Sequence, residues 1–321
     1  MTSLLIHFSP SNPSFGYEAL RVLGYRNYGG ADVAETGEDS LAKGNVRRAE
    51  EAFLRASNYY RTAEFYRRSA PFEDEISNNL ATAFSAAFVS AARLMQYPFE
   101  EISILYRNTT LPGFIFNAAR ILRHDQPLSS TEGLTVLSRS PDPNKLVLFG
   151  WSIDGYLAAR AVTSEHRFAA VILDDGVFDF GSAFRTSLPS FVNYLTDKNW
   201  DKTIGVILRT ASRFDNGARW GILNAKWTLG LISEAEVLKE VSKYNLSGLT
   251  DMITSTTLVL DAPDDHFLKG QPQELFGRLK CEKKFVSLRS EQGATTHCQG
   301  AFSSLHQVIF DYLYEVGVLS S

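Results

Sequence analysis

The 321-residue chain contains only two cysteines, which is too few for a disulfide framework. It has no run rich in Lys and Arg, and its formal net charge is −4, so we expect no nucleic-acid or anionic membrane partner. No stretch reaches the roughly 18 apolar residues that a membrane span needs, and residues 1–12 lack the pattern of a signal peptide. These absences favour a cytoplasmic protein that acts on a small molecule.

What is present indicates a folded globular chain. Hydrophobic residues make up 44% and charged residues 21% of the sequence, close to the average for globular proteins. This length allows one large α/β domain with an appendage, or two smaller domains.

The first hundred residues contain helical patterns and no strand signal. In residues 45–68, small and apolar side chains recur every three or four positions, as on one face of an amphipathic helix. A second helix is expected after Pro71, because acidic residues in its first turn suit the positive end of the helix dipole. We therefore predict a helical N-terminal domain over residues 1–100.

The pattern changes after residue 100, where strands alternate with helices. We expect a hairpin over 102–116, buried strands at 146–149, 168–173, 256–260 and 284–288, and a last helix at 302–314. Residues 181–250 contain helical patterns and no convincing strand, which indicates a helical cap inserted between strands. Residues 101–321 are thus predicted to form an α/β core with a doubly wound, mostly parallel sheet.

A serine lies on a sharp turn between one predicted strand and the next helix. The strand 146–149 leads into Gly150-Trp151-Ser152, and a strong helix former begins at about Tyr156. A serine at the apex of such a turn is exposed beyond the carboxyl end of the sheet. Ser152 is therefore our candidate nucleophile, and the alternative is an ordinary helix N-cap.

Acidic and histidine residues follow later strands in the order that a serine hydrolase requires. Asp265 is the favoured acid, with Asp261 and Asp174 as fallbacks, and His297 is the favoured base because it lies in a Gly-rich loop before the last helix. A serine hydroxyl barely ionises at neutral pH, so an imidazole must take its proton and a carboxylate must orient that imidazole. Residues 261–266 could instead form a solvated turn or, less favourably, a metal site. We expect neither a metal nor a cofactor.

Four stretches of the chain resemble one known family. They read RVLGYRNYGGAD (21–32), AEEAFLRASNYYRTAEFY (49–66), LVLDAPDDHFLKGQP (258–272) and EQGATTHCQ (291–299). They resemble the α/β-hydrolases that include fungal polyketide-shortening hydrolases of melanin pathways and 2,6-dihydroxypseudooxynicotine hydrolase. The resemblance implies an α/β-hydrolase fold with Ser152, Asp265 and His297 as catalytic triad. It also implies cleavage of carbon–carbon bonds beside a ketone, or of esters, in aromatic or polyketide substrates of secondary metabolism.

The chain departs from that family in two places. Asp154 stands where the family usually has a glycine, in a turn that needs close packing. Only 29 residues, 117–145, precede the nucleophile strand, whereas one βαβ unit takes about 30. At least one crossover is therefore expected to be absent, together with a loop that supplies an oxyanion donor. The backbone N–H of Ile153 would remain, and the loss of one donor typically costs about 100- to 1000-fold in rate.

Three functions remain open at this point. The first is a serine hydrolase; the second is a diverged enzyme for cyclisation or dehydration, with His297 or Asp154 in acid–base roles; the third is a non-catalytic remnant. A homodimer formed through the helical domain could stabilise the protein. Four aromatic residues could contact a flat substrate, although core packing is the commoner role for such residues. They are Tyr59, Tyr60, Trp220 and Trp227.

Overall fold

A computed structural model describes most of the chain. The described residues are 34–65, 67, 73–96, 99–116, 145–186, 188–294, 296–298 and 300–319. The family-like stretch 21–32 and the short interval 117–144 lie outside them. Contacts divide the chain into two compact units, Met1–Arg21 with Pro143–Ser321, and Val22–Asp142, and each is described by itself. Among the described helices, none has the length and apolar character that a membrane crossing requires.

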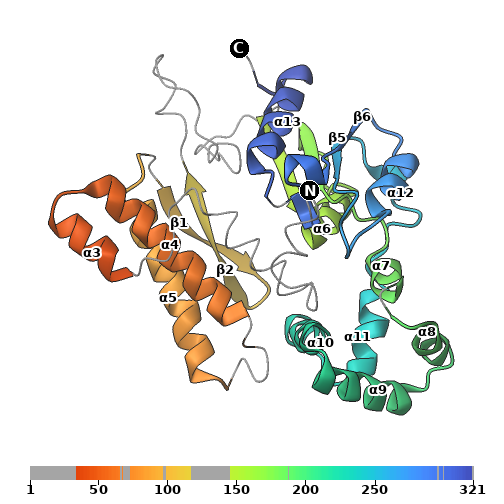
Figure 1. Ribbon diagram of the computed structural model, residues 1–321. Coiled ribbons are helices and arrows are strands. Elements are labelled where there is room, and N and C mark those ends of the chain that lie inside the picture. The colour runs from red at the N-terminus through yellow and green to blue at the C-terminus, as the bar shows by residue number, and fades with distance from the viewer. Residues whose placement is uncertain are drawn as a thin grey trace. The chain divides into compact units, whose positions relative to one another are not determined.

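The described part of the smaller unit contains three helices and a hairpin (Figure 1). The helices are α3 (Ala34–Ala42), α4 (Val46–Phe65) and α5 (Glu75–Ala92), and α4 and α5 pack through Ala49, Phe53 and Ala91. Asp74 caps α5 by accepting hydrogen bonds from the N–H groups of Ile76 and Ser77, at 3.1 and 3.3 Å. The two helices predicted after residue 44 are thus confirmed.

The predicted hairpin is confirmed as well, but it groups with the helices. Strands β1 (Phe99–Tyr106) and β2 (Thr109–Phe116) pair in antiparallel register, and both belong to the smaller unit. The sequence placed this hairpin with the core, from residue 101 onward. The boundary between the two compact units therefore lies after the hairpin instead of before it.

The larger unit is built on a parallel sheet of four described strands in the order β3-β4-β5-β6. They are β3 (Val147–Trp151), β4 (Ala170–Asp174), β5 (Thr256–Asp261) and β6 (Lys283–Ser287), close to the four predicted strands. Because the strands are parallel, their carboxyl ends meet at one edge of the sheet. Residues that follow these strands are therefore brought together.

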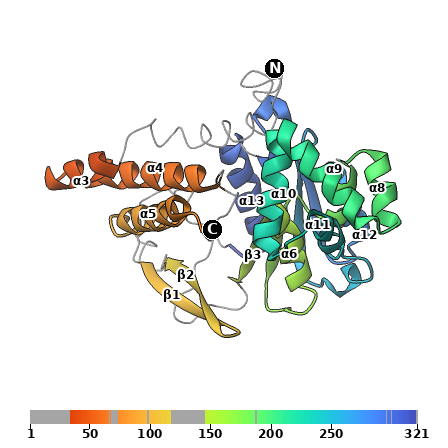
Figure 2. The ribbon, with the colours of Figure 1, turned by 90° about the horizontal axis from the view of Figure 1, so that it is seen from below.

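Helices cover both faces of this sheet (Figure 2). Along β4, Val171 and Leu173 belong to a core shared with α6 (Ile153–Ala161) and α12 (Gln271–Arg278). The alternate residues, Ala170 and Ile172, belong to a second core with α13 (Phe302–Glu315). A strand that packs on both faces needs apolar side chains at every position, which explains the unbroken apolar run in the sequence. The predicted doubly wound α/β architecture is therefore confirmed.

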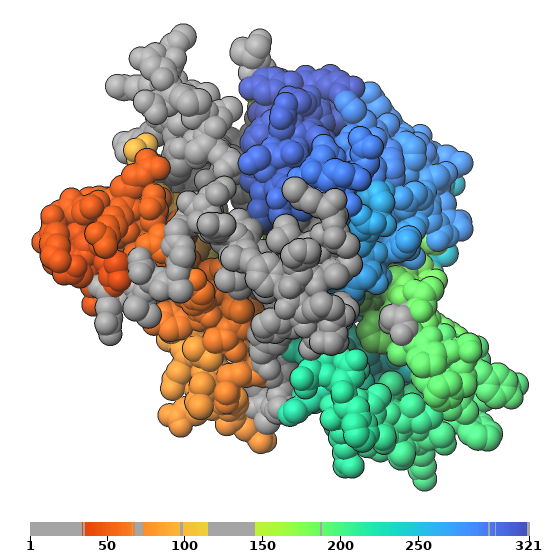
Figure 3. All heavy atoms as spheres, in the orientation of Figure 1, coloured from red at the N-terminus to blue at the C-terminus, as the bar shows by residue number. Residues whose placement is uncertain are grey.

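A helical cap lies between β4 and β5, where the sequence predicted an insertion. It contains α7 (Phe180–Thr186), α8 (Ser190–Asp197), α9 (Asp201–Phe214), α10 (Asn216–Leu229) and α11 (Glu234–Val241). Its helices enclose a small core that includes Val192, Ile204 and Leu238. The cap has its own buried side chains and forms a lobe beside the α/β core, green to teal in Figure 3.

The chain enters and leaves the cap through two adjacent segments. The N–H of Phe180 donates to the carbonyl of Tyr244 at 3.0 Å, and the N–H of Leu246 donates to the carbonyl of Phe178 at 2.9 Å. A cleft of about 350 Å³ lies at this base of the cap and contains none of the predicted catalytic residues. Its lining is Asp179, Gly181, Ser182, Arg185, Thr186, Asn193 and Ser242.

Candidate active site

Ser152 occupies a strained turn between β3 and α6. Its backbone angles are φ 60° and ψ −125°, outside the regions that residues other than glycine usually adopt. The N–H of Ser152 donates to the carbonyl of Asp174, the last residue of β4, at 2.9 Å. The turn holds the serine at the carboxyl edge of the sheet, beside the N-terminus of α6 where negative charge is favoured.

Two glycines make this turn possible. A Cβ atom on Gly150 would lie 2.1 Å from the carbonyl oxygen of Asp154, and one on Gly155 would lie 2.3 Å from the carbonyl oxygen of Asp175. Asp154, by contrast, is an exposed residue in the first turn of α6. The aspartate that replaces the family's glycine therefore points outward, and the close approaches fall on the glycines on either side.

His297 lies against the serine, as the sequence predicted. Its Nε2 atom is 3.0 Å from Ser152 Oγ, within hydrogen-bond distance, and only 5% of the residue is exposed. His297 belongs to the short turn η6 (Thr296–Cys298) and has a φ of 53°. The indole N–H of Trp151 donates to the His297 carbonyl at 3.0 Å, which ties this loop to the end of β3.

Asp265, the predicted acid, lies on the other side of the imidazole. Its Oδ2 atom is 3.0 Å from His297 Nδ1 and accepts the backbone N–H of His297 at 2.9 Å. Its Oδ1 atom accepts the backbone N–H groups of Phe267 and Leu268 at 2.6 and 2.7 Å. The structure thus brings together the three side chains that the sequence singled out from segments far apart along the chain.

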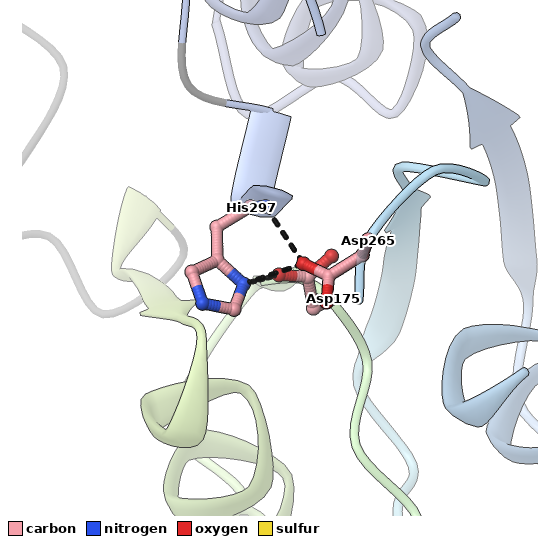
Figure 4. Close-up of side chains that lie close together, drawn as sticks. All are labelled: Asp175, Asp265 and His297. Atoms are coloured by element: carbon pink, nitrogen blue, oxygen red, sulfur yellow. Dashed lines mark hydrogen bonds and ion pairs between the residues drawn. The ribbon is translucent and has the colours of Figure 1, made fainter. Parts of the chain in front are cut away.

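A second carboxylate, Asp175, also contacts the imidazole (Figure 4). Its Oδ2 atom hydrogen-bonds His297 Nδ1, so two acids share one ring nitrogen while Nε2 points away from both. Asp175 directly follows β4, but it is not among the three acids proposed from the sequence. Asp261, one fallback, is bonded instead to Gln273 and Ser287 at 2.8 and 3.1 Å.

The other fallback, Asp174, is fully buried beside the site. Neither of its carboxyl oxygens has a hydrogen-bond partner of ordinary geometry among the described residues, and the nearby polar group is the weakly donating Cys298 thiol. Its backbone holds Ser152, but its side chain does not bond His297. Of the three acids named from the sequence, only Asp265 therefore reaches the imidazole.

Burial and hydrogen bonding separate the acids of this site. Burial raises the pKa of Asp174, where it outweighs the weak Cys298 donor and the nearby His297, and it raises the pKa of Asp175 as well. Burial acts in the same direction on Asp265, but its hydrogen bonds to the imidazole and to backbone N–H groups outweigh it and lower its pKa. For His297, burial lowers the pKa, but the carboxylates of Asp175 and Asp265 outweigh it and raise the pKa to about 10.

His297 and the two carboxylates that contact it form a group of potential metal ligands. The ligand atoms of Asp175, Asp265 and His297 lie within 4.8 Å of one another. However, both carboxylates contact Nδ1 directly, and Nε2 faces Ser152. Hydrogen bonds therefore occupy the directions that metal coordination would need, and the arrangement suits proton transfer better.

The remaining predicted site residues lie directly after the serine, on the cap or in the smaller unit. Ile153 is the first residue of α6, directly after the serine, as an oxyanion donor would require. Tyr59 and Tyr60 are half-buried on α4 of the smaller unit, and Trp220 and Trp227 are half-buried on α10 of the cap. Their contact with substrate stays a prediction, as does the absence of a second oxyanion donor, because residues 117–144 lie outside the described chain.

Two comparisons connect this arrangement with known proteins, while no family model matches the chain. The hydrolase phmG of Phaeosphaeria nodorum is 23% identical over 434 aligned residues, covering 98% of this chain and 96% of that protein. The hydrolyase poxO of Penicillium oxalicum is 20% identical, covering 93% and 96%. Both alignments are longer than the 321 residues of this chain, so parts of these relatives have no counterpart in it.

Solved structures carry the same fold. The 2,6-dihydroxy-pseudo-oxynicotine hydrolase superposes with a TM-score of 0.58 at 13% identity, covering 94% of this chain and 88% of that one. This likeness extends over both the sheet with its cap and the remainder of the chain, and it agrees with the resemblance seen in the sequence. The strand–serine–helix turn, the parallel sheet and this superposition lead to one conclusion: the chain has the α/β-hydrolase fold, and over nearly its whole length it is similar to proteins named hydrolases.

Proposed function

We propose that the protein is a serine hydrolase in which Ser152 is the nucleophile, His297 the general base and Asp265 the acid that orients the imidazole. The observation that carries the proposal is the 3.0 Å separation of Ser152 Oγ and His297 Nε2 at a strained strand-to-helix turn. Proton transfer requires a base within about 2.6–3.2 Å of the proton donor. The four N–H groups around Asp265 favour its ionised form, which an orienting acid needs.

The chemistry follows from these positions. The Ser152 hydroxyl proton passes to Nε2 while Oγ forms a bond to the substrate carbonyl carbon, and the carbonyl π electrons move to the oxygen. When this intermediate collapses, the bond to the leaving group breaks, and the imidazolium returns the proton to that group. Water then repeats the sequence on the acyl-serine and releases an acid. In this proposal, the N–H of Ile153, at the start of α6, stabilises the oxyanion.

For the substrate, we propose a small aromatic or polyketide-like ketone or ester in secondary metabolism. Cleavage of a carbon–carbon bond needs a ketone next to it, because the electron pair of the broken bond must be stabilised as an enolate before it is protonated. The sequence resemblance to polyketide-shortening hydrolases supports this class. Such a reaction needs no cofactor. We further propose that the protein acts as a homodimer in the cytoplasm.

Labelling with a fluorophosphonate tests the nucleophile. We expect the folded, full-length protein to take up one label, and Ser152→Ala to take up none. Ser190→Ala, which changes a cap serine at the start of α8, is the matched control and should label normally. Failure of the folded protein to react, or equal labelling of Ser152→Ala, would reject the serine mechanism.

A second candidate function is a non-hydrolytic elimination such as dehydration. It is favoured by the name hydrolyase given to poxO and by the two carboxylates that stabilise a protonated His297. In that case His297 would act as proton donor, and the serine would not become acylated. Turnover that survives Ser152→Ala but is lost in His297→Ala would favour this function over hydrolysis.

A further inference from the structure

The imidazole of His297 is held by two carboxylates where a serine–histidine–aspartate triad uses one. Asp265 and Asp175 come from loops after different strands, and each places an Oδ2 atom at Nδ1. The single Nδ1–H group therefore faces two acceptors. His297 and the two acids are each at most 5% exposed. Two negative charges at this distance stabilise a positive imidazole strongly, because buried charges are poorly screened.

The two acids differ in how their own charge is satisfied. Asp265 accepts three backbone N–H groups in addition to the imidazole, from His297, Phe267 and Leu268. Asp175 bonds the imidazole through Oδ2, whereas its Oδ1 is buried and has no hydrogen-bond partner among the described residues. The charge of Asp265 is thus stabilised by backbone N–H groups as well as by the imidazole, but the charge of Asp175 depends on the imidazole being protonated.

Among the described residues, the titratable groups next to the site supply no positive charge that could replace the imidazole. From β4, Asp174 is buried, and among the described residues neither of its carboxyl oxygens has a hydrogen-bond partner of ordinary geometry; from β5, Asp261 is bonded to neutral side chains. His266 hydrogen-bonds Thr296 at 2.9 Å, and burial lowers its pKa, which disfavours its charged form. Burial likewise raises the pKa of the Cys298 thiol. Among these groups, His297 is left as the cation that compensates the paired acids.

We propose that Asp175 is a second positioning residue which, together with Asp265, holds His297 as an imidazolium at neutral pH, so that Ser152 becomes a nucleophile only in alkaline solution. At neutral pH, Nε2 carries a proton and donates to Ser152 Oγ instead of accepting from it. Removing that proton leaves Nδ1–H between the two acids and frees Nε2 to act as a base. The catalytic consequence rests on the proposed serine mechanism, but the charge state of the imidazole does not.

An NMR titration of His297 tests the charge state without reference to catalysis. The chain is labelled with ¹³C at histidine Cε1, and the His297 signal is assigned by its loss in His297→Gln. We expect a midpoint near the value of about 10 that the two carboxylates favour. A midpoint near the ordinary histidine value of about 6.5 in the wild-type protein would overturn the inference whether or not any variant folds.

Two isosteric variants then separate Asp175 from its neighbour. Asp175→Asn removes one charge at Nδ1, and we expect the His297 midpoint to fall by about one to three pH units. Asp174→Asn changes the adjacent buried acid, which does not bond the imidazole, and should leave the midpoint in place. An unchanged midpoint in Asp175→Asn, with circular dichroism like that of the wild type, would also overturn the inference.

The pH dependence of fluorophosphonate labelling connects the inference with function. We expect the wild-type labelling rate to rise up to the His297 midpoint, about tenfold per pH unit, and Asp175→Asn to label faster than wild type at pH 7. If the folded protein is not labelled at any pH, the serine mechanism fails while the titration still decides the inference. If labelling is maximal at pH 7 and the midpoint is near neutral, the inference fails and the serine mechanism stands.

Discussion

At the scale of single residues, the site depends on backbone conformations that are costly in isolation. Ser152, Asp175, His297 and Cys298 all have φ between 53° and 60°, in the left-handed region that residues with side chains rarely adopt. Each such residue costs of the order of 1–3 kcal/mol and persists only where the surroundings hold it. Hydrogen bonds to the backbone of these residues are therefore as important as the triad contacts themselves.

Trp151→Phe tests one of these supports. The substitution removes the indole N–H that donates to the His297 carbonyl at 3.0 Å, but it keeps an aromatic ring next to Phe302. We expect a loss of about 0.5–1.5 kcal/mol in the free energy of unfolding, and labelling of Ser152 slowed by up to about tenfold as His297 loses its alignment.

Labelling kinetics and chemical denaturation measure the two effects. Trp200→Phe, at a tryptophan that is 57% exposed at the start of the cap helix α9, is the matched control and should change neither. Wild-type labelling by Trp151→Phe would mean that the indole does not align the loop.

At the scale of elements, the turn at Ser152, which we call the elbow, requires a strand, a helix and a loop to pack closely together. Gly150 lets β3 approach the first turn of α6, and Gly155 lets α6 approach the loop after β4. The second approach matters chemically, because the carbonyl that Gly155 faces belongs to Asp175. The position of α6 thus helps to set the backbone of a residue that contacts the imidazole.

Gly155→Ala should be much more damaging than a glycine-to-alanine change elsewhere. The new Cβ would lie 2.3 Å from the Asp175 carbonyl oxygen, so strand, helix or loop must shift. We expect a loss of about 2–3 kcal/mol in the free energy of unfolding, together with loss of labelling.

Gly221→Ala is the matched control for this substitution. Gly221 is a glycine inside α10 with nothing within 4 Å of a new Cβ, and alanine there should stabilise the protein by up to about 1 kcal/mol. Urea unfolding compares the two variants, and equal effects would show that the approach of α6 to Asp175 does not constrain the elbow.

At the scale of the whole molecule, buried carboxyls make stability depend on pH in opposite directions. Asp265 has a lowered pKa in the folded state, so its contribution is present above its unfolded pKa and is lost as pH falls through the folded value. Asp174 has a raised pKa because of burial, so its contribution is present below its unfolded pKa and is lost as pH rises. Folding therefore takes up a proton at Asp174 in the intermediate pH range.

Asp174→Asn should remove this loss of stability. The free energy of unfolding of the variant, relative to wild type, should rise by up to about 1.4 kcal/mol per pH unit above about pH 4, until the folded-state pKa of Asp174 is reached. Urea unfolding at several pH values measures the slope, and Asp265→Asn provides a comparison whose difference from wild type should be constant above about pH 4 and change only at lower pH. A constant difference between Asp174→Asn and wild type would mean that Asp174 titrates alike in both states.

Much of the core and the site could be predicted because the local signals were strong. The apolar runs before Ser152, Asp174 and Asp261 read as buried strands, and each is followed at once by polar residues. In a parallel sheet those residues must meet at one edge, so the convergence of Ser152, Asp265 and His297 could be expected from their order alone. The sequence also predicted the hairpin as a pair of strands, but it did not show to which compact unit the hairpin belongs. Pairing within a hairpin depends on neighbouring residues, whereas packing against helices depends on residues far away in the sequence.

The sequence by itself determined the strand–serine–helix turn, the helical cap and the identity of the nucleophile and base candidates, because periodicity and turn chemistry act over a few residues. Only the tertiary structure decided which acids reach the imidazole. Asp174 and Asp175 are adjacent and chemically identical, but the Asp174 side chain is fully buried beside the Cys298 thiol, whereas the Asp175 side chain bonds His297 Nδ1. That choice depends on the positive φ of Asp175 and on the helix packed against its carbonyl through Gly155, which are consequences of packing between elements far apart in the chain.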